Sequence, residues 1–393
     1  MVYTIYLILA VVVLLGFAGS FFAQGILLDL ARKYNFYDHF DTRKINKEPR
    51  PRLGGVGIFF GFLIGFYFLF FIIYLLQNTP HKITVDFSLI QIMLYICSMI
   101  FFFLLGLYDD FKGLKAHEKL LVEIVIATIL FFIGFKIELI TLPFFKESID
   151  VGAFSYPLTI LWVTGISNAI NLIDGLDGLA GGVIAISSVT IIIICMLNHL
   201  IFPAIIVSAL LGGVLGFLPY NYYPSRILMG DGGSILAGTI LATVSLRIAQ
   251  KASLGIALMI PIIFLAVPVI DTLLSFSRRL LSGRNPFKGD DDHIHHRLMR
   301  KGFSEKKAAN ILLVLTFIFS TLSVIVSYFR GTPRFIALFF SLLLGILLIV
   351  YLNYINLGFR WKNGLHRSGK DNGNSNGNGD TSPHSSSPGN SAG

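Results

Sequence analysis

The sequence is poor in charged residues, which make up 13% of its 393 positions, while hydrophobic residues make up 54%. Soluble domains carry about 25% charged residues, so an ordinary soluble globular protein is excluded. Many apolar runs exceed the roughly 18 residues that mark a membrane-spanning helix. We therefore expect an all-α integral membrane protein, a polytopic bundle of about eleven transmembrane helices.

Cysteine is almost absent, and basic residues are missing near the start of the chain. Cys97 and Cys195 both fall inside apolar runs, which excludes a disulfide scaffold and a cysteine-based zinc site. No Lys or Arg precedes Arg32. Because a signal peptide begins with a positive region, we expect residues 3–23 to form a span rather than a cleaved leader.

The distribution of Lys and Arg predicts the orientation. Most of them lie in residues 24–53, 109–119, 277–308 and the C-terminal tail, on one side of the predicted bundle. The positive-inside rule makes this side cytoplasmic, with the N-terminus outside and the C-terminus in the cytoplasm. The predicted spans are residues 3–23, 55–77, 89–108, 119–137, 157–171, 179–197, 203–219, 234–250, 255–277, 309–329 and 334–353.

Two domains are expected. Residues 1–355 would form the multi-span membrane domain. Residues 356–393 are mostly Gly, Asn and Ser and lack the apolar side chains that a folded core needs, so we expect a mostly disordered cytoplasmic tail.

Five polar segments lie on the predicted cytoplasmic side: residues 41–55, 108–120, 168–182, 219–234 and 285–298. Their gathering at one face predicts an active site at the membrane surface. An ion-coupled transporter is an alternative, but its sites should lie near mid-membrane, usually within a repeated architecture, and we find no convincing internal repeat. A structural protein with a lipid-binding cytoplasmic rim would explain the basic residues near Arg52 but not Asp231 among glycines.

The segment NAINLIDGLDGLAGG, residues 168–182, carries four polar residues at intervals of three. These residues are Asn168, Asn171, Asp174 and Asp177. On one regular helix they would spread halfway around the axis. Gly175 and Gly178 predict a helix break that would let the four groups converge on a ligand. A simple polar turn is the alternative, although acids beside hydrocarbon are costly.

Three further aspartates are typical of phosphate and metal chemistry. Asp109 and Asp110 are adjacent at the end of a span, where one pKa should rise unless a cation is near. Such a pair suits Mg²⁺ or a catalytic base, although a helix-end turn would also explain it. Lys119 could neutralise a phosphate or pair with Glu123 one turn later. Asp231 lies in the glycine-rich MGDGGS, where a carboxylate can approach a phosphate–metal complex or simply cap a helix.

The segment HIHHR supplies hydrogen-bond donors. His293, His295, His296 and Arg297 could bind a pyrophosphate or a sugar. Zinc is disfavoured because this segment contains no cysteine and no HExxH spacing. The sequence thus combines carboxylates that could hold a metal, basic side chains that could bind phosphate, and a membrane scaffold. Together they predict a reaction that joins a soluble phosphate compound to a lipid one.

Five motifs in order carry a family resemblance: PRLGG (51–55), DD (109–110), NxxNLIDGLDGLAGG, MGDGGS and HIHHRL. Over residues 1 to about 355 the chain resembles the polyprenyl-phosphate N-acetylhexosamine-1-phosphate transferases. The resemblance implies transfer of a sugar 1-phosphate from a UDP-N-acetylhexosamine to undecaprenyl phosphate, with release of UMP. It also implies a plasma (inner) membrane location, a catalytic site facing the cytoplasm, and Mg²⁺ as cofactor, with Mn²⁺ as an alternative ion.

Partners and donor follow from the same resemblance. Membrane lipid is an expected partner, a homodimer is allowed, and nucleic acid is not expected. Ile294 interrupts the three consecutive histidines that peptidoglycan translocases carry, which favours UDP-N-acetylglucosamine over UDP-N-acetylmuramoyl-pentapeptide as the donor; the 4-epimer, UDP-N-acetylgalactosamine, is an alternative. A phospho-N-acetylmuramoyl-pentapeptide transferase is the alternative within the family.

The resemblance also implies residue roles. Asp109, Asp110 and Asp231 would be catalytic, with Asp231 and Asp110 on the metal. The substrate-binding residues would be Arg52, Lys119, Asn168, Asn171, Asp174, Asp177, Asn221, His293, His295, His296 and Arg297. The chain departs from the family pattern at Asn46, where many relatives have His.

Overall fold

The computed structural model describes residues 2–34, 50–76, 87–140, 149–251, 258–283 and 292–352. The chain divides into two units at Leu348, and the described residues of the first unit form one compact body. Asn46 and the predicted disorder of residues 356–393 lie outside the described residues.

Long helices make up most of the first unit. The major helices are α1 (Val2–Tyr34), α2 (Gly54–Leu76), α3 (Leu89–Lys112), α4 (Ala116–Phe132), α5 (Ser155–Ile173), α6 (Leu179–Leu197), α7 (Ile201–Asn221), α8 (Gly230–Lys251), α12 (Glu305–Tyr328) and α13 (Thr332–Tyr351). The shorter elements are α9 (Met259–Phe264), α10 (Ala266–Leu281), α11 (Ile294–Arg300), the 3₁₀ turn η1 (Gly152–Phe154) and an antiparallel pair, β1 (Leu139–Ile140) with β2 (Ile149–Asp150).

Within the described ranges, eight helices are long and apolar enough to cross a membrane: α1, α3, α5 with its preceding turn, α6, α7, α8, α12 and α13. The chain is therefore an all-α, multi-pass membrane protein, as predicted. The predicted number of eleven spans is not confirmed. The apolar part of α2 is described only over Gly54–Phe68, and α4, with 17 residues, is shorter than the roughly 18 residues of a span.

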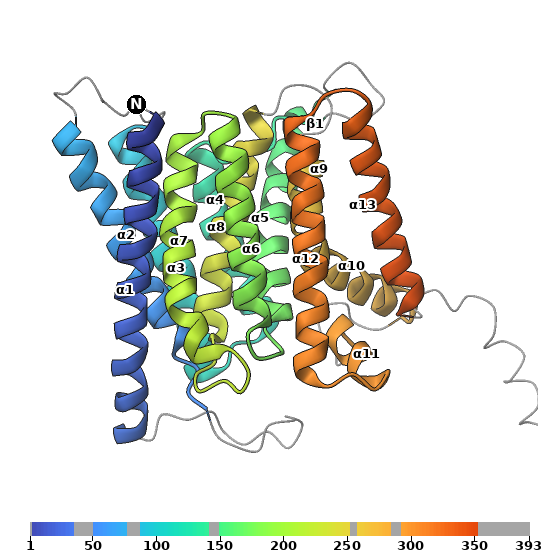
Figure 1. The fold of residues 1–393 in the computed structure, drawn as a ribbon, viewed down its shortest axis with the longest axis horizontal. Coiled ribbons are helices and arrows are strands. Elements are labelled where there is room, and N and C mark those ends of the chain that lie inside the picture. The colour runs from blue at the N-terminus through green and yellow to red at the C-terminus, as the bar shows by residue number, and fades with distance from the viewer. Residues whose placement is uncertain are drawn as a thin grey trace, which may run out of the picture. The chain divides into compact units, whose positions relative to one another are not determined.

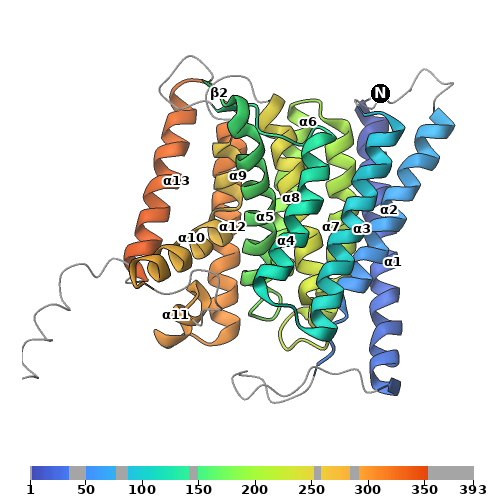
Figure 2. The ribbon, with the colours of Figure 1, turned by 180° about the vertical axis from the view of Figure 1, so that it is seen from behind.

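The prediction of one continuous span over residues 255–277 is wrong. The described part of this stretch contains two helices, α9 and α10, separated at Leu265. Pro268 explains the break, because proline has no N–H to donate to the carbonyl of Phe264. That carbonyl instead lies 3.4 Å from the hydroxyl of Ser187. Figures 1 and 2 show α10 running across the axes of its neighbours.

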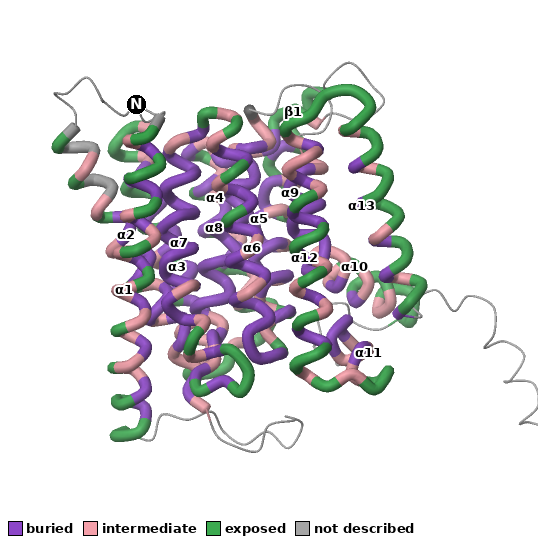
Figure 3. The backbone as a smooth tube through the Cα atoms, viewed as in Figure 1, coloured by how far each residue is buried: buried purple, intermediate pink, exposed green. Residues whose placement is uncertain are grey.

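Helices α7 and α8 form the centre of the packing. Helix α7 contacts α1, α2 and α6, while α8 contacts α3 and α5. Figure 3 shows both as largely buried, whereas α1 and α13 carry exposed faces. Glycines allow close helix contact: a Cβ on Gly61 would lie 2.5 Å from the carbonyl oxygen of Gly16, and one on Gly212 would lie 2.5 Å from that of Val13.

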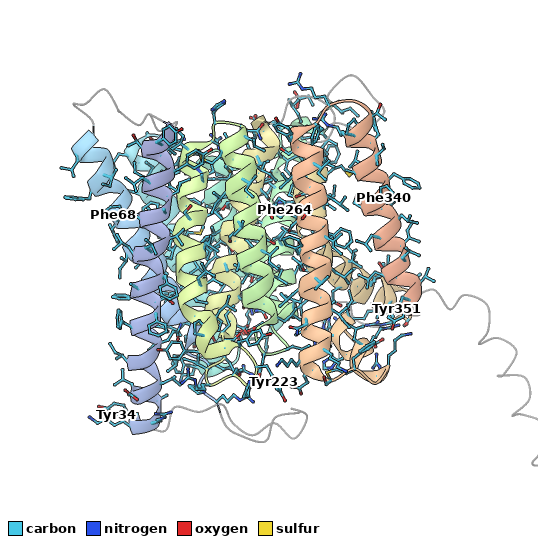
Figure 4. All side chains as sticks on the ribbon, viewed as in Figure 1. Tyr34, Phe68, Tyr223, Phe264, Phe340 and Tyr351 are labelled. Atoms are coloured by element: carbon cyan, nitrogen blue, oxygen red, sulfur yellow. The ribbon has the colours of Figure 1, made fainter. Side chains whose placement is uncertain are left out.

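The alternating direction of the helices collects the polar loops at one end. There α3, α5 and α7 end, and α4, α6 and α8 begin (Figure 1). Figure 4 places Tyr223, in the loop after α7, at the same end as Tyr34 at the end of α1. The predicted convergence of polar segments is confirmed by direct contacts between them, which define the site below.

Candidate active site

The last turn of α3 carries two carboxylates that bind different partners. Both oxygens of Asp110 accept backbone N–H groups from the first turn of α8: Oδ1 from Asp231 at 3.0 Å and Oδ2 from Gly232 at 3.1 Å. The first N–H groups of a helix lack partners within it, and its dipole favours a negative charge there. Asp110 therefore caps α8 from a neighbouring helix.

Small residues are required at this junction of α3 and α8. A Cβ on Gly106 would lie 2.4 Å from the carbonyl oxygen of Asp231. Gly230 has a φ of +74°, which is strained for other residues, and a Cβ there would meet Asp110 at 2.6 Å. The glycines of MGDGGS thus bring the α8 terminus onto the aspartate pair.

Lys119, in the first turn of α4, joins the two helices through its ammonium group. Its Nζ lies 2.9 Å from Oδ2 of Asp109 and also binds Asp231. Oδ1 of Asp109 accepts the backbone N–H of Leu114 at 2.6 Å. The alternative pairing of Lys119 with Glu123 is not what the structure has: among the described residues, this ammonium pairs with Asp109 and Asp231.

The predicted break between α5 and α6 is confirmed. Helix α5 ends at Ile173, α6 begins at Leu179, and Gly178 has a φ of +75°. Asp174 lies directly after α5. Burial raises the pKa of Asp174 well above its usual range, and the negative charges of Asp231 and Asp110 raise it further. Several carboxylates thus share one region with the ammonium of Lys119.

Two asparagines of α5 face this acid cluster. Asn168 donates to Oε2 of Glu123 at 2.6 Å and to the carbonyl of Thr164 at 2.9 Å. Asn171 lies close enough to Asp231 to interact with its carboxyl. The buried amide nitrogen of Asn171 nevertheless makes no hydrogen bond of normal length and angle to any described residue. A buried, unsatisfied donor beside carboxylates is expected where a ligand supplies the acceptor.

Asp177 points to a different partner from the other three residues of its series. Its oxygens accept hydrogen bonds from the guanidinium of Arg50 at 2.9 Å and 3.0 Å. They also accept from the hydroxyl of Ser225 at 2.9 Å and from the backbone N–H of Ser225 at 3.0 Å. Arg50 itself lies 2.5 Å from the Ser225 hydroxyl. This contact ties the segment before α2 to the loops after α5 and α7. A role for Asp177 toward a nucleotide stays a prediction.

Asn221 also holds loops together. Its Oδ1 accepts the N–H of Gly178 at 3.0 Å, and its Nδ2 donates to the carbonyl of Ile227 at 2.9 Å. The side chain is buried, and both ends of its amide are engaged with backbone. Its predicted contact with substrate is untested. Arg52 is partly exposed and lies 4.0 Å from Oδ1 of Asp110.

The histidine segment packs on the break between α5 and α6. A Cβ on Gly175 would lie only 2.6 Å from Nε2 of His295, so the imidazole lies directly against the chain next to Asp174. Burial, with smaller contributions from His296 and His293, lowers the pKa of His295 to about 3. His295 is therefore neutral near pH 7 and cannot supply a positive charge to a phosphate.

Positive charge in this segment comes from arginines around Asp292. Arg278 of α10 and Arg297 of α11 lie 2.8 Å and 2.5 Å from Oδ2 of Asp292, and Arg300 binds its other oxygen. Three guanidinium groups thus surround one carboxylate among the described residues of this segment. Residues 284–291, including the rest of the predicted loop, lie outside the described residues.

Comparison with known proteins agrees with this arrangement. Residues 92–249 match the family described as glycosyl transferase family 4, and this stretch contains Asp109, Asp110, Lys119, Asp174 and Asp231. The chain is 33% identical over 330 residues to a Bacillus subtilis protein named "Probable undecaprenyl-phosphate N-acetylglucosaminyl 1-phosphate transferase", covering 84% of this chain and 86% of the relative. The chain belongs to glycosyl transferase family 4.

Other members carry related names. The Thermotoga maritima "Undecaprenyl-phosphate alpha-N-acetylglucosaminyl 1-phosphate transferase" is 31% identical over 304 residues, 77% of this chain and 86% of the relative. A Halalkalibacterium halodurans "Phospho-N-acetylmuramoyl-pentapeptide-transferase" is 30% identical over 296 residues, 71% of this chain and 83% of the relative. The family resemblance drawn from the five motifs is confirmed.

Three polar residues of this family 4 site were not predicted as site residues. The sequence offers Glu123 only as a partner for Lys119, does not distinguish Asp271, and groups Arg50 with the basic residues near Arg52. Glu123 and Asp271 are buried carboxylates within helices α4 and α10. An acid inside an apolar stretch was the available signal, because burying one without a partner is costly. Arg50 had no signal separating it from its basic neighbours.

Proposed function

We propose that this protein transfers N-acetylglucosamine 1-phosphate from UDP-N-acetylglucosamine to undecaprenyl phosphate, forming undecaprenyl-diphosphate-N-acetylglucosamine and UMP. The names of its relatives support the reaction class. The observation that carries the assignment is the ammonium of Lys119 held between Asp109 and Asp231 where α3, α4 and α8 meet. The proposed site faces the cytoplasm from the plasma membrane, where a soluble nucleotide sugar and a lipid phosphate can both reach it.

The reaction requires charge neutralisation more than covalent chemistry from the protein. An oxygen of the lipid phosphate attacks the β-phosphorus of the UDP-sugar. The bond from that phosphorus to the bridging oxygen breaks, and UMP leaves with the electron pair. Lys119 would place its charge against the phosphate oxygens, and the unsatisfied amide of Asn171 would donate to one of them. Asp109, 14% exposed, would orient the acceptor phosphate or accept its proton.

A Mg²⁺ ion fits Asp231 better than it fits Asp110. Asp231 is 25% exposed, whereas both oxygens of Asp110 already accept backbone N–H groups. Within the described ranges no group of three His, Cys, Asp or Glu side chains could hold a metal. Mg²⁺ typically uses one or two carboxylates with phosphate oxygens and waters. Bound there, the ion would neutralise charge on the leaving phosphate. Asp110 would hold the helix that carries Asp231.

The test is product formation by the purified protein in detergent. Radiolabelled UDP-N-acetylglucosamine and undecaprenyl phosphate should give a labelled lipid and UMP. EDTA should stop the reaction, and added Mg²⁺ should restore it. Asp231→Asn should lose at least about 100-fold in rate, a typical scale for a lost electrostatic group.

The matched control is Asp29→Asn, because Asp29 is 80% exposed and makes a surface ion pair with Arg32 at 3.6 Å. Such pairs contribute little, so the control should turn over at the wild-type rate. A reaction that ignores EDTA, or a fully active Asp231→Asn protein, would contradict the metal assignment. Absence of labelled lipid from a folded wild-type protein would contradict the transfer reaction itself.

A further inference from the structure

A buried carboxylate on α10 binds the start of α11. Asp271 is 2% exposed, and its two oxygens have separate partners. Oδ1 accepts the backbone N–H of Ile294 at 2.8 Å, and Oδ2 lies 3.0 Å from Nδ1 of His293. The hydroxyl of Ser275, one turn later on α10, lies 3.4 Å from the same Nδ1. The side chain of Asp271 is thus directed at the first histidine of the HIHHR segment.

The chemistry of the pair fixes the position of a proton. An ionised carboxylate can only accept hydrogen bonds, and Asp271 does accept one from Ile294. Nδ1 of His293 is then the donor in their contact. In a neutral imidazole only one nitrogen carries hydrogen, so Nε2 is left as an acceptor.

Contacts continue from His293 to the acid cluster. Its ring stacks on that of His295, with centroids 5.8 Å apart and planes 5° from parallel. His295 in turn lies against Gly175, the neighbour of Asp174. These contacts connect His293, through His295, to the loop between α5 and α6.

We propose that Asp271 is a positioning residue that holds His293 with its proton on Nδ1, so that Nε2 accepts a hydrogen bond from a hydroxyl or N–H group of the sugar nucleotide. In this role His293 recognises the sugar and does not donate to its phosphates. The substrate part of the inference rests on the proposed function. The proton position does not, and the two are tested separately.

The proton position is read from the ¹⁵N NMR signals of histidine in the full-length, ¹⁵N-histidine-labelled protein in detergent. His293→Gln identifies the signals of His293 by their loss. The wild-type protein at neutral pH should show hydrogen on Nδ1. Hydrogen on Nε2 in the wild type, alone or together with hydrogen on Nδ1, overturns the proposal. The assignment requires that the His293→Gln protein keeps the remaining histidine signals of the wild type, and it does not depend on any activity.

Asp271→Asn should reverse the tautomer. The N–H of Ile294 can only donate, so the oxygen of the new asparagine amide must face it. The Nδ2 of this amide then donates to Nδ1 of His293, which moves the imidazole hydrogen to Nε2. The matched control is Thr272→Val, because the buried hydroxyl of the next residue has no partner among the described residues. The control should keep the wild-type tautomer. An Asp271→Asn protein that also keeps it overturns the proposal.

Activity tests the substrate role. Asp271→Asn should lower kcat/KM for UDP-N-acetylglucosamine by about 10- to 100-fold, the usual effect of removing a partner that orients a functional histidine. KM for undecaprenyl phosphate should not change. A reversed tautomer with unchanged kcat/KM overturns the role in sugar recognition. If the wild type forms no product, the proposed function fails and the sugar contact with it, while the NMR result still decides the positioning of His293.

Discussion

Replacement of Asp110 by asparagine should loosen the first turn of α8 and slow the transfer reaction. The carboxylate is 3% exposed and accepts the N–H groups of Asp231 and Gly232. Asparagine keeps one acceptor oxygen, but its NH₂ group then faces the second N–H. The substitution removes one hydrogen bond, the negative charge at a helix N-terminus and the restraint on Asp231.

The cost can be estimated from these contacts. A hydrogen bond to a charged group contributes about 1.5–3 kcal/mol, and removal of a helix cap costs about 0.5–2 kcal/mol. We expect a loss of about 2 kcal/mol, which raises the local opening equilibrium about 30-fold. Turnover should fall at least about 100-fold because Asp231 is no longer held in place.

Hydrogen–deuterium exchange read by mass spectrometry measures the first effect in a peptide spanning residues 229–236. Asp109→Asn is the matched control, since Asp109 binds Lys119 and the N–H of Leu114 but no backbone N–H of α8. The control should lose at least about 100-fold in activity while exchange in this peptide stays unchanged. An inactive Asp110→Asn protein with wild-type exchange would refute the reasoning and assign Asp110 to the chemistry itself.

Three further outcomes are expected. A chain truncated after Trp361 should insert and remain active, because the removed tail lacks apolar residues to dock; a folded but inactive truncation would contradict this. With both donors present, mass spectrometry should find N-acetylglucosamine lipid, and a product that is mainly the muramoyl-pentapeptide lipid would move the protein to the peptidoglycan branch. Thermal unfolding should show wild-type stability falling as pH drops from 6.5 toward 3, by up to about 1.4 kcal/mol per pH unit. In this pH range His295 binds a proton in the unfolded chain but not in the folded one, where its pKa is lowered to about 3. The decline in stability should therefore be shallower in His295→Gln. An equal slope in this variant would contradict the burial argument.

The helices that cross the membrane were the most predictable part of the fold. The predicted span over residues 179–197 coincides with α6, and those near α5, α7 and α8 differ from the structure by a few residues at their ends. Hydrocarbon requires long apolar segments with internally satisfied backbones, so hydropathy alone locates them. The prediction of one span at 255–277 was wrong because hydropathy does not register that Pro268 interrupts the helix.

The membrane class, the helix break between α5 and α6, the gathering of polar segments and the family could all be predicted from the sequence. These follow from local composition, glycine placement and motif order, which need no knowledge of distant contacts. The pairing of charges could not be predicted and required the three-dimensional structure. It joined Lys119 to Asp109 and Asp231, Asp110 to the α8 terminus, Asp177 to Arg50 and Asp271 to His293. The physical reason is that a buried charge is stabilised by whichever partner helix packing brings within about 3 Å, and sequence separation carries no information about that distance.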